Sequence, residues 1–188
     1  MYPLFETLCI ENGKIQNIDL HQARYERSLR EYYGKSAVKI FNLFSLIQLP
    51  AYLQNQLVRC RIDYNDETTQ IQYFEYHRKI YRTFQPVICD DIEYSLKYSD
   101  RSLINTLFAQ RGACDEIIII KNGKVTDCSI GNLIFRQGKK WYTPDTPLLL
   151  GTQREKLLQE GKIQERTIFQ EDIVNFDEIK IINAMNSL

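Results

Sequence analysis

Short stretches of apolar and β-branched residues alternate along this chain with polar turn residues, a pattern that predicts strands. The predicted strands are 4–10, 15–18, 57–64, 69–77, 87–89, 116–120, 124–127, 133–136, 140–143, 163–168 and 178–182. Asn-Gly pairs at 12–13 and 122–123 are typical of hairpin turns, and Asn65-Asp66 and Gly138 predict two more. Most of the predicted strands are therefore expected to pair in antiparallel fashion.

Helices are predicted between these strands. Their expected ranges are 20–33, 38–48, 52–56, 152–159 and a segment that begins at Asp100 or Ser102 and ends at Gly112. Asp19 is expected to cap the first helix, Gly34 to end it, and Pro50 to stop the second.

A domain boundary is predicted at 84–86, where Pro86 interrupts the strand pattern. The prediction is an α+β fold in two lobes. Residues 1–84 form a small N-terminal α/β lobe, and residues 85–188 form a larger C-terminal lobe that carries Lys97.

Composition narrows the classes of function. Lys plus Arg and Asp plus Glu number 24 each, so the formal net charge is zero and nothing favours nucleic acid as a partner. The N-terminus lacks a signal-peptide pattern and the longest apolar run, 117–120, is too short to cross a bilayer, so we expect a cytoplasmic protein with no membrane partner. Five cysteines without a CxxC pair and only two histidines predict reduced thiols and no metal site.

Lys97 is the first candidate for chemistry. It lies between a predicted strand and a predicted helix, with Tyr94 and Tyr98 nearby. A lysine that forms a Schiff base needs a lowered pKa, which desolvation and neighbouring cations can supply. A solvated surface lysine would have the same local sequence, so Lys97 by itself remains only a candidate.

Two further segments place polar residues at the end of a predicted strand and at the start of a predicted helix. Asp127 ends a predicted hairpin strand, and small polar residues up to Asn132 follow it, an arrangement that suits either a ligand or ordinary turn formation. Gly151 precedes a predicted helix, where Thr152 and Gln153 would contribute N–H groups suited to phosphate. Most helix starts of this composition hold only water.

The order of these features resembles the class IV family of pyridoxal-phosphate (PLP) enzymes. Phe5-Glu6-Thr7 is similar to the family's FET, and residues 21–28 (HQARYERS) to its HxxRLxxS. Lys97 with Asp100-Arg101 resembles KxxNR, and Asp115-Glu116 with Val125-Thr126-Asp127 and Asn132 resembles DE…VTE…N. Thr143-Pro144 with 151–154 resembles TP…GITR, and 177–184 resembles the last strand and phosphate loop.

The resemblance implies a shortened, two-lobed fold of the D-amino-acid aminotransferase type that binds PLP and a small-molecule amino substrate as a homodimer. Lys97 would then hold the cofactor as a Schiff base and move protons, while Asp127, with Asn132 nearby, pairs with the pyridine nitrogen. The residues in phosphate-binding positions are Arg24, Gly151, Thr152, Gln153, Asn183 and Ala184.

The chain also departs from the family pattern. The segment that usually precedes FET is missing, and the chain stops soon after the phosphate loop. Asp127 replaces the usual glutamate and is one methylene shorter, Thr152-Gln153 replaces Ile-Thr, and Ala184 falls where a hydroxyl is common.

Three functions stay open at this point. Asp100-Arg101 and Asn183-Ala184 look most like aminodeoxychorismate lyase, which releases pyruvate to give 4-aminobenzoate. Branched-chain aminotransferases usually have a tyrosine where this chain has Ser102, although a D-amino-acid or branched-chain type of transaminase remains an alternative. The departures described above also allow a degenerate, non-catalytic member that binds the cofactor weakly or not at all.

Overall fold

The computed structural model describes residues 1–34 and 38–188, which form two compact units. Unit 1 comprises Met1–Arg78 and Leu96–Asp100, and unit 2 comprises Lys79–Ser95 and Arg101–Leu188. The sequence placed the boundary after residue 84 and put Lys97 in the second lobe, whereas the structure groups Lys97 with unit 1. The reason is main-chain pairing, because Phe5 N donates to Lys97 O at 3.0 Å.

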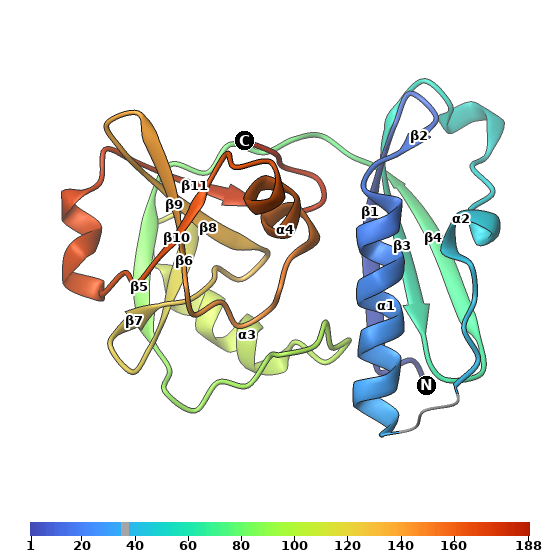
Figure 1. Cartoon of the computed structure of the whole chain (residues 1–188), viewed down its shortest axis with the longest axis horizontal. Helices are drawn as coiled ribbons and strands as arrows, with labels where there is room; N and C mark the ends of the chain where they lie inside the picture. The colour runs from blue at the N-terminus through green and yellow to red at the C-terminus, as the bar shows by residue number, and fades with distance from the viewer. Residues whose placement is uncertain (35–37) are drawn as a thin grey trace. The chain divides into compact units, whose positions relative to one another are not determined.

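Unit 1 contains one antiparallel sheet with the strand order β2-β1-β3-β4 (Figure 1). Its strands are β1 (Leu4–Glu11), β2 (Lys14–Ile15), β3 (Leu57–Tyr64) and β4 (Thr69–Glu75). Asn12 and Gly13 join the first two strands with φ of 50° and 72°, as the Asn-Gly pair predicted.

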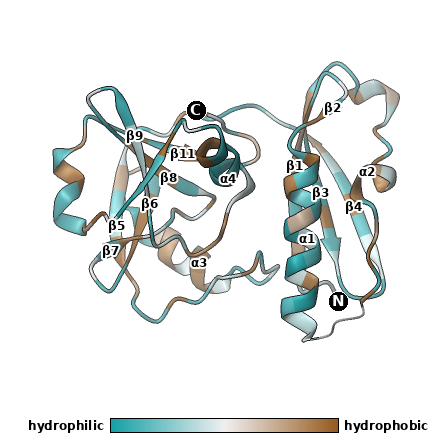
Figure 2. Ribbon diagram, in the orientation of Figure 1, coloured by the Kyte–Doolittle hydropathy of each residue, from teal (hydrophilic) through white to brown (hydrophobic). Residues whose placement is uncertain are grey.

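Helix α1 (Ile18–Tyr33) covers one face of this sheet. It carries both hydrophilic and hydrophobic residues (Figure 2), and its buried Tyr25 and Leu29 join the apolar cluster formed by β1 and β3. The helix begins at Ile18, so Asp19 lies in its first turn and does not cap it as predicted. A carboxylate there still interacts favourably with the helix dipole. Gly34 ends the helix with φ of 60°.

The helix predicted for 38–48 is wrong in most of its length. Only α2 (Leu43–Leu46) is helical, and a short 3-10 turn, η1 (Ala51–Leu53), follows it. Side chains of α1 satisfy the backbone before α2: Gln22 donates to Phe41 O at 3.0 Å and accepts from Leu43 N at 2.9 Å. These bonds replace the helical ones that the sequence pattern led us to expect.

Unit 2 contains two sheets, with the strand orders β5-β6-β7 and β10-β9-β8-β11. The first holds β5 (Phe84–Ile88), β6 (Glu116–Lys121) and β7 (Lys124–Val125); the second holds β8 (Asn132–Gln137), β9 (Lys140–Pro144), β10 (Gln164–Arg166) and β11 (Glu178–Ile182). The pairs β5–β6 and β9–β10 are parallel, and the other pairs between these strands are antiparallel. Pro86 lies inside β5 and not at a boundary, because an edge strand tolerates a residue that donates no hydrogen bond.

The helical segments of unit 2 are α3 (Ser102–Phe108), η2 (Ala109–Arg111), α4 (Thr152–Gln159) and η3 (Gln170–Asn175). Leu157 of α4 packs with Ile134 of β8 and Ile182 of β11. This packing holds α4 against the two strands. Within the described residues, no helix combines the length and apolar character that a membrane span requires.

Candidate active site

Asp127 is a buried carboxylate just beyond the β6–β7 hairpin, with a side chain only 5% exposed. One of its oxygens, Oδ1, accepts from Asn132 Nδ2 at 2.7 Å. The other, Oδ2, accepts from the backbone N–H groups of Leu148 at 3.1 Å and Leu149 at 3.0 Å. Burial raises the pKa of Asp127 from 3.8 to about 6 despite these donors. A cationic partner would favour its ionised form.

Asn132 links Asp127 to the start of α4. Its Nδ2 also donates to Leu149 O at 2.9 Å, and a Cβ on Gly151 would lie 2.0 Å from its Oδ1. Only glycine therefore allows the chain to pass this close to the asparagine. Thr152 and Gln153 follow as buried residues in the first turn of the helix.

The turn after β11 packs against the same loop. Asn183 Nδ2 donates to Ile130 O at 3.2 Å, and its Oδ1 accepts from Met185 N at 2.9 Å and Asn186 N at 3.0 Å. A Cβ on Gly131 would approach Ile182 O to 2.6 Å. The predicted residues Asp127, Asn132, Gly151, Thr152, Gln153, Asn183 and Ala184 therefore belong to one region of unit 2. The Asn183 side chain there forms hydrogen bonds within the turn that contains it.

Two residues that carry this region were quoted in motifs but given no role from the sequence. Glu116 is 1% exposed and accepts from Ser129 Oγ at 2.8 Å and from Ile117 N at 2.8 Å. Arg101 Nη2 donates to Ser129 O at 2.6 Å. Both side chains anchor the loop between Asp127 and Asn132. The sequence did contain a signal for Glu116, which is an acidic residue at the start of an apolar strand. Such a residue needs a buried partner.

Lys97 and Arg24 lie in unit 1. Lys97 is half-buried, and its Nζ lies 4.6 Å from the centre of the Phe5 ring. Arg24 faces the sheet from α1 and forms two hydrogen bonds with Glu6, from Nε at 2.8 Å and from Nη2 at 2.5 Å. His21 Nδ1 lies 2.7 Å from Glu6 Oε2.

The acid in this cluster is ionised. Burial alone would raise the pKa of Glu6, but Arg24 and His21 more than offset it, and the pKa falls to about 2. Burial lowers the pKa of His21, and its contact with Glu6 opposes that shift without reversing it. The cluster therefore holds one negative carboxylate, one guanidinium and a neutral imidazole at neutral pH.

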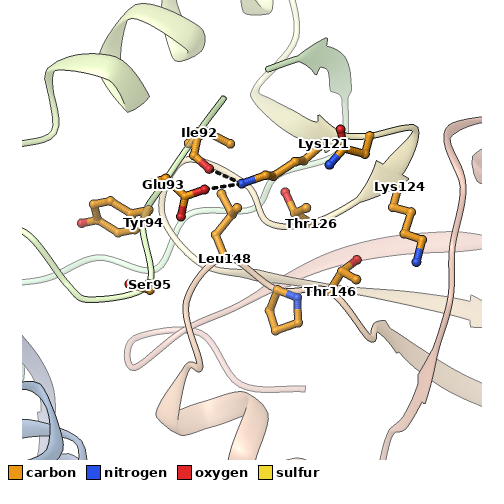
Figure 3. Close-up of a pocket in the computed structure, with 11 residues that line it drawn as sticks. Ile92, Glu93, Tyr94, Ser95, Lys121, Lys124, Thr126, Thr146 and Leu148 are labelled. Carbon is orange, nitrogen blue, oxygen red and sulfur yellow. Dashed lines mark hydrogen bonds and ion pairs between the residues drawn. The ribbon is translucent and has the colours of Figure 1, made fainter. Parts of the chain in front are cut away.

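A cavity of about 410 Å³ opens elsewhere in unit 2 (Figure 3). Its lining residues are Ile92, Glu93, Tyr94, Ser95, Lys121, Asn122, Lys124, Thr126, Thr146, Pro147 and Leu148. Lys121 Nζ is held by Ile92 O and Glu93 Oε1, each at 2.7 Å. None of the predicted site residues lines this cavity, although Thr126 and Leu148 adjoin Asp127 and Leu149 in the chain.

Comparison with known proteins identifies the family. The family model for amino-transferase class IV matches residues 95–188, which is half of the chain. The chain therefore belongs to the class IV aminotransferase family, and it is an enzyme of the lyase or aminotransferase kind. Members of this family generally depend on PLP.

One relative and several solved structures are similar to this chain. A Haemophilus influenzae Rd protein described as uncharacterized is 95% identical over 100% of both chains. A crystal structure of a proposed 4-amino-4-deoxychorismate lyase from Haemophilus somnus 129PT is 55% identical, with a TM-score of 0.96 over 100% of this chain and 98% of that one. The Escherichia coli branched-chain amino acid aminotransferase shares the fold, with a TM-score of 0.74 and 16% identity over 99% of this chain and 74% of that one. The predicted fold class is confirmed.

Proposed function

We propose that this chain binds PLP through Lys97 and acts as an aminodeoxychorismate lyase, converting aminodeoxychorismate into pyruvate and 4-aminobenzoate. When bound, PLP supplies an electron sink for the amino substrate. The observation that carries the proposal is the buried Asp127, whose carboxylate is held by Asn132 and by two backbone N–H groups. An acid fixed in this way suits a ring nitrogen that must keep its proton.

The region around Asp127 has the features that a phosphate group requires. Gly131 and Gly151 let two backbone segments approach Asn183 and Asn132 more closely than a Cβ would permit. The first turn of α4 presents backbone N–H groups, which favour an anion. These donors suit a phosphate dianion, and the family resemblance assigns the guanidinium of Arg24 to the same group.

Lys97 has two roles in this proposal. Its amine would hold the cofactor covalently, and when released from the cofactor it would move protons to and from the substrate. The Phe5 ring lies beside this amine, 4.6 Å from Nζ to the ring centre, and limits the directions that the side chain can take. Asp127 would bind the ring nitrogen of the cofactor, and Arg24 would bind its phosphate. Both residues orient the cofactor, and neither transfers a proton to the substrate.

Two observations favour the lyase over a transaminase. The Haemophilus somnus protein bears the lyase name and is 55% identical over the whole of this chain. Arg101, from the lyase-like Asp100-Arg101 pair, anchors Ser129 in the Asp127 loop, and the next residue is an exposed serine where branched-chain enzymes usually have tyrosine.

The reaction is tested by supplying aminodeoxychorismate without any 2-oxo acid and following 4-aminobenzoate by its fluorescence. Wild-type protein is expected to form 4-aminobenzoate and pyruvate in equal amounts, and Lys97→Ala to form neither. Exchange of amino groups between amino acids and 2-oxo acids, with no 4-aminobenzoate, would instead support a D-amino-acid or branched-chain type of transaminase.

Cofactor attachment is tested separately. PLP added to the protein should produce near-visible absorbance, and borohydride reduction followed by peptide mass spectrometry should find the cofactor on Lys97. Lys121→Ala is a matched control, because Lys121 is another half-buried lysine and lies in unit 2; it should keep the absorbance. Wild-type protein that stays colourless would favour the non-catalytic alternative.

A further inference from the structure

Glu6, His21 and Arg24 form a polar cluster inside the core of unit 1. Their side chains are 0%, 1% and 5% exposed. Glu6 belongs to β1, where Leu4 and Leu8 point into the same apolar cluster, and the other two residues lie three positions apart on α1. The sequence motifs contained all three residues but gave no sign that they bind one another.

The contacts fix the orientation of the Arg24 guanidinium. Glu6 holds one edge of this planar group through Nε at 2.8 Å and Nη2 at 2.5 Å, so the direction of the Nη1 edge is also set. Glu6 is ionised and can only accept hydrogen bonds, so His21 must donate its Nδ1 proton at 2.7 Å. This additional donor restrains the carboxylate from turning out of the guanidinium plane.

Stability alone does not account for this cluster. Taking a carboxylate and a guanidinium out of water costs about as much as their attraction returns, and apolar side chains of similar volume often stabilise a core equally well. What the arrangement does provide is a guanidinium that cannot change its direction. A fixed cation is useful where it must meet an anion in one geometry.

We infer that Glu6 and His21 are positioning residues that hold Arg24 in the orientation in which it binds the phosphate group of PLP. This inference rests on the proposed function, in which Arg24 contacts the phosphate. Glu6 and His21 act only through Arg24. Their influence should therefore be confined to ligands that carry a phosphate.

The experiment compares PLP with pyridoxal, which has the same aldehyde and ring but no phosphate. Dissociation constants are measured from the absorbance that develops when each aldehyde is titrated into the cofactor-free protein. Glu6→Gln places an amide donor against Arg24 or His21 and so releases the guanidinium. The Kd for PLP is expected to rise about 10-fold or more, since a hydrogen bond to a charged group is lost, while the Kd for pyridoxal changes by less than about twofold.

The matched control is Glu26→Gln. This acid lies on the same helix and pairs with Arg30 at 3.0 Å, but near the surface, where its side chain is 30% exposed. It should leave both dissociation constants unchanged. Circular dichroism and urea unfolding of the cofactor-free proteins show whether Glu6→Gln folds. If it does not, His21→Gln keeps both bonds from Arg24 and should raise the Kd for PLP selectively, by a smaller factor.

A second measurement asks whether the effect passes through Arg24. In an Arg24→Lys background, Glu6→Gln should no longer change the ratio of the two dissociation constants. The reason is that lysine cannot form the paired hydrogen bonds by which the guanidinium is held to Glu6. Equal weakening of PLP and pyridoxal, no weakening of either, or full additivity with Arg24→Lys would each overturn the inference. Wild-type protein that develops no absorbance with PLP would contradict the proposed function, which is a different outcome.

Discussion

Replacing Asp127 by asparagine tests the physical effect of burying this carboxylate. Burial raises its folded-state pKa from 3.8 to about 6, so between these pH values the folded protein binds a proton that the unfolded chain has released. The stability that Asp127 contributes is therefore fully present below pH 4 and is lost as the pH rises through 6. A shift from 3.8 to about 6 corresponds to about 3 kcal/mol of unfolding free energy.

The assay is urea unfolding of the cofactor-free protein at pH values from 4 to 7, with wild type and Asp127→Asn at equal concentration. The variant does not titrate at this position, so the wild-type stability minus the variant stability should fall by about 2 to 3 kcal/mol across this range. Asp115→Asn is the control, because backbone N–H groups of Arg82 and Thr83 lower the pKa of exposed Asp115 and give the opposite sign. A difference between wild type and Asp127→Asn that is flat with pH, or that rises, would refute the reasoning.

Two other substitutions probe the loop that holds Asp127. Gly151→Ala should lower the unfolding free energy by about 2 kcal/mol in urea titrations, because the new Cβ would displace Asn132 from its bonds to Asp127 and Leu149 O; unchanged stability would show that the loop can relax. Glu116→Gln should lower it by about 1 to 3 kcal/mol, because one amide oxygen cannot accept from both Ser129 and Ile117 N as two carboxylate oxygens do. Ser129→Ala in the Glu116→Gln background should then add little, and full additivity would argue against the shared anchor.

Local patterns predicted most strands and turns because their causes are local. The strand 57–64 and the two Asn-Gly hairpins have the predicted positions, since alternation and positive φ are properties of neighbouring residues. The helix predicted for 38–48 was wrong, because side chains of α1 bind the backbone there. The prediction of a boundary at Pro86 was wrong. The local sequence does not show that this proline lies in an edge strand, which pairs in parallel with β6.

The candidate site was predicted as a set of residues and not as a set of contacts. The motif order brought out Asp127, Asn132 and Gly151, which the structure places together. It gave no role to Glu6, although an acid on the core-facing side of an apolar strand demands a buried partner. That partner is supplied by a helix that begins after the next turn, and a single sequence shows neither the pairing nor its geometry.

The short segment that carries Lys97 has a consequence for how the protein is synthesised. Leu96–Asp100 completes the main-chain pairing at the N-terminal end of unit 1. Lys97 O accepts from Phe5 N of the first strand, and Ser99 N donates to O of the preceding Pro3 at 2.7 Å. A ribosome must therefore translate well beyond Arg78 before the N-terminal unit can finish folding. A gene fragment that ends at residue 78 would leave the edge of that strand exposed to other chains.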